Sequence, residues 1–176
     1  MIFAMAACGK DAAPETTDTE TSEVTEEASD ALAGTTYQLS AISYEGEDGN
    51  MVDGTVDADH PDIIVFGTDG TYSETFYEPD YENDDPDTLL ERKVDGTYTI
   101  DGSTVTLSTR VVEPTSADEE LPEGSMPITE EEAKAMTPTI TLEGSDLVFT
   151  TEHFEHANDN GSTMVITATK NVFTKK

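Results

Sequence analysis

GTYTIDGSTVTL, residues 96–107, is the stretch that decides the fold. Asp101–Gly102 at its centre is a two-residue hairpin signal, because a type I′ turn needs positive φ at both central residues and this dipeptide tolerates it. A turn there pairs Ile100 with Ser103, and side chains alternate between the two faces of each strand. The hairpin therefore predicts a sheet with one buried face. The apolar face is expected to hold Tyr98, Ile100, Val105 and Leu107, and the opposite face Thr97, Thr99, Thr104 and Thr106.

Further hairpin signals follow at short intervals along the chain. Residues 68–70 (Thr-Asp-Gly) predict a three-residue hairpin loop with its glycine in the left-handed conformation, which places Phe66 opposite Tyr72. Residues 139–149 repeat the central hairpin, with their apolar side chains on one face whether the loop is of the two-residue or the four-residue kind. Short strands separated by regular turn signals predict an all-β barrel or sandwich.

One short helix is expected among these strands, near residues 130–136. Thr129 and Glu132 have the spacing of a capping box, and the helix must end before Pro138. Acidic stretches rich in glycine and proline are expected to be loops, and a final long strand follows the last turn. The expected loops and turns are residues 45–54, 78–87, 113–127 and 158–161, and the final strand is 164–170.

The charge balance excludes several classes of function. The chain of 176 residues has 39 acidic and only 8 basic residues, a net charge of −31. Such a surface repels phosphate backbones, so nucleic-acid binding is not expected, and neither is a basic membrane-binding patch. The single cysteine, Cys8, excludes an internal disulfide framework and a multi-cysteine metal site. The charge is typical of a solvated extracellular coat, and the alternative is a basic or cation-carrying partner. We expect a monomer.

The N-terminal residues contain a candidate membrane-targeting signal. Met5-Ala6-Ala7-Cys8 follows an apolar start and precedes a polar tract. This stretch resembles the lipobox of bacterial lipoproteins, which implies that the thiol of Cys8 receives a diacylglyceryl group and that the preceding segment is cleaved. Two acyl chains are enough for stable anchoring. The resemblance therefore implies a lipid anchor on the extracytoplasmic face of a bacterial membrane; the alternative is an incidental cysteine in a disordered terminus.

Three segments are expected along the chain. Residues 1–8 are the lipoprotein signal segment, which lacks a basic start and is expected to be truncated at its N-terminus. Residues 9–33 contain almost no bulky apolar side chains, so they cannot offset the entropy of ordering and are expected to form a disordered acidic tether. Residues 34–176 form the β domain.

Three pieces of that domain together resemble bacterial lipocalin-like domains of the calycin type. They are GTTYQL at 34–39, VFGTDGTY at 65–72 and the central hairpin stretch. The family opens with Gly-x-Trp, whose Trp plugs the barrel floor; this chain has no Trp, and its nearest match is Gly34 followed by Tyr37. The resemblance implies an up-and-down antiparallel β-barrel, open or partly flattened. It implies no particular ligand.

Five aromatic residues are the candidate ligand-binding residues. They are expected in the core, and they would line the mouth of the barrel if that mouth is open. No Gly-x-Ser-x-Gly elbow, His-Glu-x-x-His motif or phosphate-binding loop occurs, so we expect no catalytic residue, no cofactor and no enzymatic activity. The five aromatic residues are Tyr37, Phe66, Tyr72, Tyr98 and Phe149.

No metal site is expected. His153 and His156 are three residues apart and would lie on opposite faces of a strand, so solvated positions at a strand end are expected for them. The acidic run at residues 82–87 offers oxygen ligands but lacks the spacing of an EF-hand loop, which favours weak, diffuse cation binding. The sequence thus favours a lipid-anchored binding domain for a small apolar ligand or a surface partner. The alternatives are a structural or interaction spacer and a cation-binding surface protein.

Overall fold

The structure, a computed structural model, describes residues 31–80, 85–115, 127–157 and 163–176. Cys8, nearly all of the expected tether, the expected turn at 158–161 and the side chains of the acidic run 82–87 lie outside the described residues. The strands are β1 (Thr36–Glu45), β2 (Met51–Asp53), β3 (Ile63–Phe66), β4 (Thr71–Asp80), β5 (Asp85–Asp101), β6 (Thr104–Leu107), β7 (Thr139–Glu143), β8 (Asp146–Thr151), β9 (Phe154–Ala157), β10 (Thr163–Ile166) and β11 (Thr169–Lys175).

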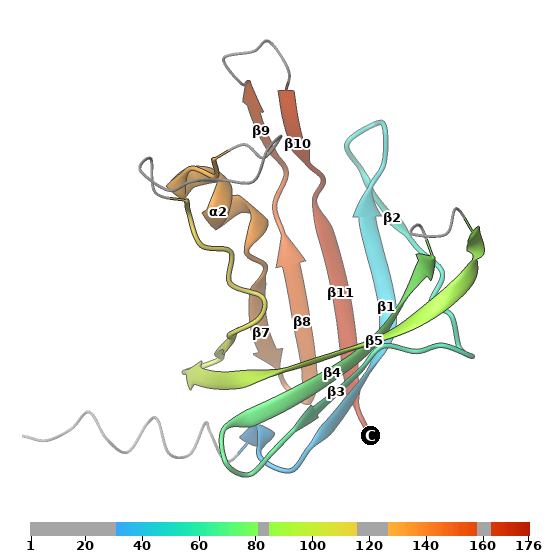
Figure 1. The fold of residues 1–176 in the computed structure, drawn as a ribbon, viewed down its shortest axis with the longest axis vertical. Coiled ribbons are helices and arrows are strands. Elements are labelled where there is room, and N and C mark those ends of the chain that lie inside the picture. Colours follow the sequence, from blue (N-terminus) through green and yellow to red (C-terminus); the bar gives the residue numbers. More distant parts are fainter. Residues whose placement is uncertain (1–30, 81–84, 116–126, 158–162) are drawn as a thin grey trace, which may run out of the picture.

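Eight of these strands close into an antiparallel barrel. The hydrogen-bonded order β1-β3-β4-β5-β6-β7-β8-β11 returns to β1, because β11 also pairs with β1 from Tyr37↔Lys175 to Tyr44↔Thr169. β2 pairs with the upper end of β1, and β9 pairs with β10 in a separate two-stranded sheet (Figure 1). The closed ring confirms the predicted all-β antiparallel barrel, and it is neither open nor a sandwich.

The central hairpin, β5–β6, has the predicted faces in a different register. All four predicted apolar residues are buried and all four threonines are exposed. The pairing is Ile100↔Val105 and Asp101↔Thr104, so the turn consists of Gly102–Ser103 and the predicted partner of Ile100 was wrong. Gly102 has φ +61° at the first central position, where hairpin turns need positive φ, and Gly-Ser serves there as well as Asp-Gly. The slip of two residues in pairing preserves the faces.

The two neighbouring hairpins confirm their predictions. Phe66 pairs with Tyr72 across the β3–β4 turn, where Gly70 has φ +81°. Ile140 pairs with Phe149 in β7–β8, whose two-residue turn has Gly144 at φ +65°. Short turns therefore connect the strands in these parts of the barrel.

Two predicted boundaries were wrong. Most of the expected loop at 78–87 is strand, because β4 and β5 continue as a long hairpin in which polar side chains pair across the ladder. Arg92 Nε donates to Glu78 Oε1 at 2.6 Å, and the Tyr77 hydroxyl donates to Glu91 at 3.0 Å. The expected final strand at 164–170 is instead broken between β10 and β11 at residues 167–168.

The helix α2 (Glu130–Met136) lies where the sequence predicts it. Thr129 is the N-cap, and both halves of the capping box with Glu132 are present. At the other end, the Thr137 hydroxyl donates to the carbonyl of Ala133 and accepts from the N–H of Val112. These contacts fasten the helix to the segment that follows β6.

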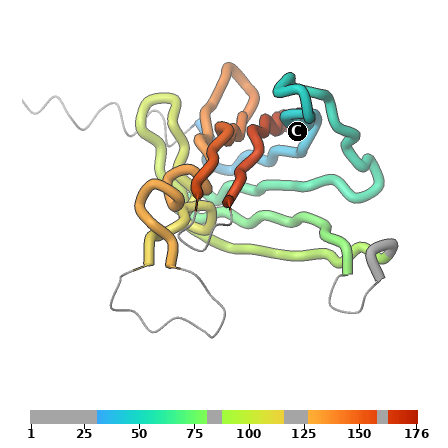
Figure 2. Tube along the Cα trace, turned by 90° about the horizontal axis from the view of Figure 1, so that it is seen from above, coloured from blue at the N-terminus to red at the C-terminus, as the bar shows by residue number. Residues whose placement is uncertain are grey.

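The core fills the end of the barrel where β1 begins. Tyr37 is fully buried and meets Phe66 edge to face at 5.8 Å, and Phe66 meets Tyr98 at 4.9 Å. Leu32, expected in the tether, is also fully buried, in a helical turn that closes this end (bottom of Figure 1), so the folded part reaches back beyond Gly34. In the view from above, the β4–β5 hairpin forms one side of the barrel and β11 with β1 the other (Figure 2).

Candidate functional site

A cavity of about 700 Å³ lies between α2 and the neighbouring strands β6, β7 and β8. It forms where the barrel wall is weakest, because β6 and β7 share only the pairs Thr104↔Thr141 and Val105↔Ile140. Beyond those pairs the strands diverge, and α2 occupies the space beside the upper ends of β7 and β8 (Figure 1). The helix and the short ladder together define the site.

The lining contains residues from both faces of the barrel wall. Buried side chains from the inner face line it, among them Val105, Leu107 and Ile140. Exposed threonines from the outer face, Thr104 and Thr106, line it too. Those buried side chains are at most 3% exposed, so the accessible space lies on the side of the exposed residues, where a small molecule could reach it.

The ionisable groups around the cavity balance. Arg110 and Lys134 face Glu131 and Glu152 in the lining, together with His153. The whole chain, in contrast, has 39 acidic and 8 basic residues. The lining is thus far less acidic than the rest of a protein of net charge −31, so a neutral molecule meets few like charges there.

A buried ion pair adjoins the cavity through Arg110. Glu74 is 1% exposed and receives both Nε (3.1 Å) and Nη2 of Arg110, whose guanidinium lies 5.9 Å from the ring centre of Phe76. Burial, and then the negative charge of Glu74, raises the pKa of the nearby Asp62 carboxyl above its usual range. Neither acid lines the cavity, so the two carboxyls do not form a paired acid and base within it.

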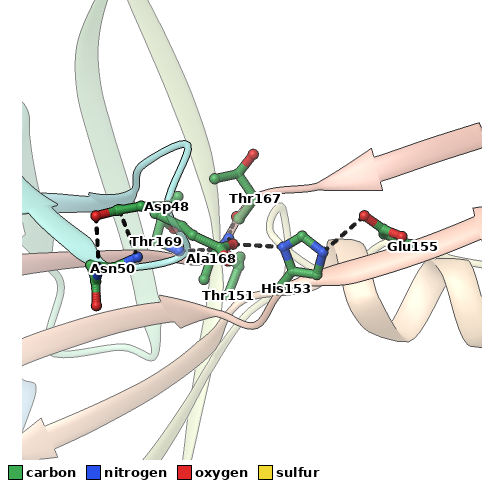
Figure 3. A network of polar contacts seen from close by, with 9 residues as sticks. Asp48, Asn50, Thr151, His153, Glu155, Thr167, Ala168 and Thr169 are labelled. Carbon is green, nitrogen blue, oxygen red and sulfur yellow. Dashed lines mark hydrogen bonds and ion pairs between the residues drawn. The ribbon is translucent and has the colours of Figure 1, made fainter.

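His153 is the centre of a polar network at the upper rim. Its Nδ1 lies 2.6 Å from Glu45 Oε2, and its Nε2 lies 3.3 Å from Glu155 Oε1 (Figure 3). The hydrogen bond to Glu45 raises the pKa of His153 above its ordinary value and lowers that of Glu45. The sequence does not reveal this contact, because the two residues are 108 positions apart and no motif links them.

The five predicted ligand-binding aromatics lie outside the lining of this cavity, but two of them adjoin it: Tyr98 pairs with Leu107 and Phe149 pairs with Ile140, both lining residues. All five are buried in the core, at most 7% exposed, and none of them lines the cavity. They belong to one core with Leu32 and with the lining residues Val105, Leu107 and Ile140, whereas the lining comes chiefly from α2, the whole of β6, the start of β7 and the end of β8. The sequence does contain one signal for the lining: the alternating threonines that precede and follow the buried positions of β6.

The described residues contain no cluster of three or more His, Cys, Asp or Glu side chains that could hold a metal ion. His153 lies in the break before β9 rather than in a strand, and His156 lies within β9. His153 is about half exposed but ion-paired, whereas the sequence predicts only a solvated position. The expected lack of catalysis, of a cofactor and of a nucleic-acid partner stays a prediction, as does the monomeric state.

Among the described parts of the chain, no helix has the length and apolar character needed to cross a bilayer. The fold and cavity define a closed eight-stranded antiparallel barrel, which is compatible with the lipocalin-like class. No family model and no curated protein matches the chain. One solved structure, described as "NMR structure of the protein from Burkholderia xenovorans", is 14% identical over 99% of both chains, with a TM-score of 0.36. A similarity this low supports no inference about fold or function.

Proposed function

We propose that the barrel binds a small, largely apolar molecule in the cavity beneath α2. The observation that carries the proposal is the short ladder between β6 and β7, beside which a cavity of about 700 Å³ lies against α2. Ligand sites are commonly of this size. The lining combines apolar residues such as Val111 and Phe154 with threonines and ionisable side chains, which favours a neutral molecule with some polar groups.

A fluorescent apolar probe, N-phenyl-1-naphthylamine, tests this proposal. We expect saturable binding to the full chain, and a loss of about tenfold or more in affinity for Ala135→Phe, which adds a ring to the cavity side of α2. Ala41→Phe is the matched control, because Ala41 is exposed on β1, outside the cavity. Equal affinity for both variants, or no binding to the unaltered protein, would contradict the proposal.

We further propose that lipid on Cys8 anchors this domain at the extracytoplasmic face of a bacterial membrane. The support is the lipobox resemblance and the acidic, polar composition of the residues between Cys8 and the barrel. Metabolic labelling with radioactive palmitate in a bacterial host should mark the protein, and Cys8→Ser should abolish the label and release the protein from the membrane fraction. Membrane association that persists in Cys8→Ser would contradict the anchor.

A further inference from the structure

The β9–β10 hairpin forms an arm beyond the barrel rim. In the described residues its two strands pair only with each other. The segments that connect them to the barrel, residues 152–153 and 167–168, are not in strands. Thr151 Oγ1 bridges the base of the arm, donating to the Thr167 carbonyl (3.2 Å) and accepting from the Thr169 N–H (3.1 Å). We call these two segments the hinge, because the strand ladders of the barrel and the arm are interrupted there; at 167–168 the Glu45 N–H still donates to the Ala168 carbonyl at 2.9 Å.

His153 ties this hinge to the barrel. Glu45, at the end of β1, holds His153 Nδ1 at 2.6 Å and also accepts from the N–H of Ala168 in the other hinge segment, at 3.3 Å (Figure 3). Glu155 on the arm holds His153 Nε2 at 3.3 Å. One imidazole thus joins the barrel wall, the hinge and the arm.

The arm also forms part of the cavity. Glu152, His153 and Phe154 all line the cavity described above, and the Phe154 ring is stacked on His156 at 6.3 Å. A swing of the arm about the hinge would carry Phe154 away from α2 and widen the entrance. The position of the arm therefore determines the shape of the cavity.

We propose that the His153–Glu45 ion pair is a latch that holds the arm against the barrel, and that the arm is released when His153 loses its proton. The consequence for ligand exchange rests on the proposed function of the cavity. The latch itself rests only on the hinge, the ion pair and the position of Phe154 in the cavity wall.

The charges around His153 set the pH at which the latch acts. Glu45 of β1 and Glu155 of β9 favour the imidazolium ion, and the neighbouring Glu152 lies in the hinge. Because the pKa of His153 is raised above 6.5, its contribution is complete below that pH and is lost as the pH rises through the raised value. Glu45, whose pKa is lowered from 4.5, must stay ionised, so the latch is expected to be strongest between pH 4.5 and 6.5.

Other charged groups share the cavity wall with His153. Lys134 and Glu131 of α2 and Arg110 line the same cavity, but the pKa of His153 is raised by its contacts with Glu45 and Glu155. Arg110 is ion-paired with Glu74. The pKa of Glu132 in α2 is lowered chiefly by its hydrogen bonds with Thr129 and to a smaller extent by the charge of His156 on the arm.

Distances between two spin labels test the latch directly. Labels at Val165→Cys on the arm and Met51→Cys on β2 occupy exposed positions, and Cys8→Ser removes the native thiol from the full chain. Double electron–electron resonance should give a narrow distance distribution at about pH 5.5 and a broader, longer one at about pH 8.5. The midpoint should lie above 6.5, the ordinary histidine value.

The variants decide between a latch and a general effect of pH. Glu45→Gln should give the broad distribution at both pH values, and His153→Gln should do the same. His60→Gln is the matched control, because His60 pairs with Asp57 in a loop at 3.0 Å and should leave the transition unchanged. A distribution that is independent of pH, or a narrow one in both latch variants, would overturn the proposal.

Probe binding separates this proposal from the proposed function. If the labels move with pH but N-phenyl-1-naphthylamine does not bind, the latch stands and ligand binding in the cavity fails. If the probe binds and the labels do not move, the latch fails and the binding function stands. If both hold, the dissociation rate of the probe should increase over the pH range in which the labels move apart.

Discussion

Glu74 is the residue at which a single side chain is expected to have a clear effect on the stability of the barrel. It is 1% exposed on the inner face of β4, and Arg110 is the partner that satisfies both of its oxygens. Burying an ion pair gains little net stability, because desolvation offsets the attraction, but removing one partner leaves a charge in a poorly hydrated place. We therefore expect the intact pair to add little to the free energy of unfolding, and the loss of one partner to lower it strongly.

Substitution of the two partners, singly and together, tests this view. Arg110→Met should destabilise the fold by about 2–3 kcal/mol, at the lower end for a broken buried pair because Arg110 is itself partly exposed. Glu74→Met combined with Arg110→Met should recover much of that loss, since two apolar side chains can replace the pair. Urea unfolding of the variants measures both free energies, and a double variant less stable than Arg110→Met would contradict the interpretation.

At the scale of strands and helices, local rules predicted most of the hairpins and the helix. Alternation identified the buried face of β5–β6, but Asp-Gly and Gly-Ser are both good turns, so the sequence left the register undecided by two residues. In β1, a bulge between Leu39 and Ala41 reverses the phase of the alternation and brings Ile42 against the core. The expected loop at 78–87 was wrong because the polar ladder of the β4–β5 hairpin resembles a loop in composition.

Local sequence rules could not predict the cavity. It depends on how far β6 and β7 pair before they diverge, and on where α2 then lies, and both are set by contacts between distant segments. The contact between Glu45 and His153 is of the same kind. What sequence reasoning did supply for the site is the helix itself, through its capping signal.

That capping signal gives the prediction at this scale. Thr129→Ala removes the N-cap hydroxyl, which accepts from the N–H of Glu132, and should lower the free energy of unfolding by about 1 kcal/mol. Thr99→Ala, on the exposed face of β5, is the control and should change stability by less than about 0.5 kcal/mol. Thermal melts of the two variants compare them, and equal losses would show that the cap does not stabilise α2.

For the molecule as a whole, the charge of −31 is the dominant property. Like charges on a compact surface repel one another and destabilise the folded state, and salt screens that repulsion over about 10 Å at 0.1 M. We therefore expect the melting temperature to rise with sodium chloride. Calcium chloride at matched ionic strength is the control: an additional rise would support the cation-binding alternative, and a fall with either salt would contradict the role assigned to repulsion.

The seam between β1 and β11 has a consequence for synthesis. The strand nearest the start of the domain hydrogen-bonds to the strand nearest its end, Thr169–Lys175. During translation, the edge of β1 that pairs with β11 therefore stays unpaired until β11 has left the ribosome. Exposed strand edges invite pairing with other chains. Until β11 is translated, the barrel cannot close, and the free edge of β1 is open to pairing with other chains.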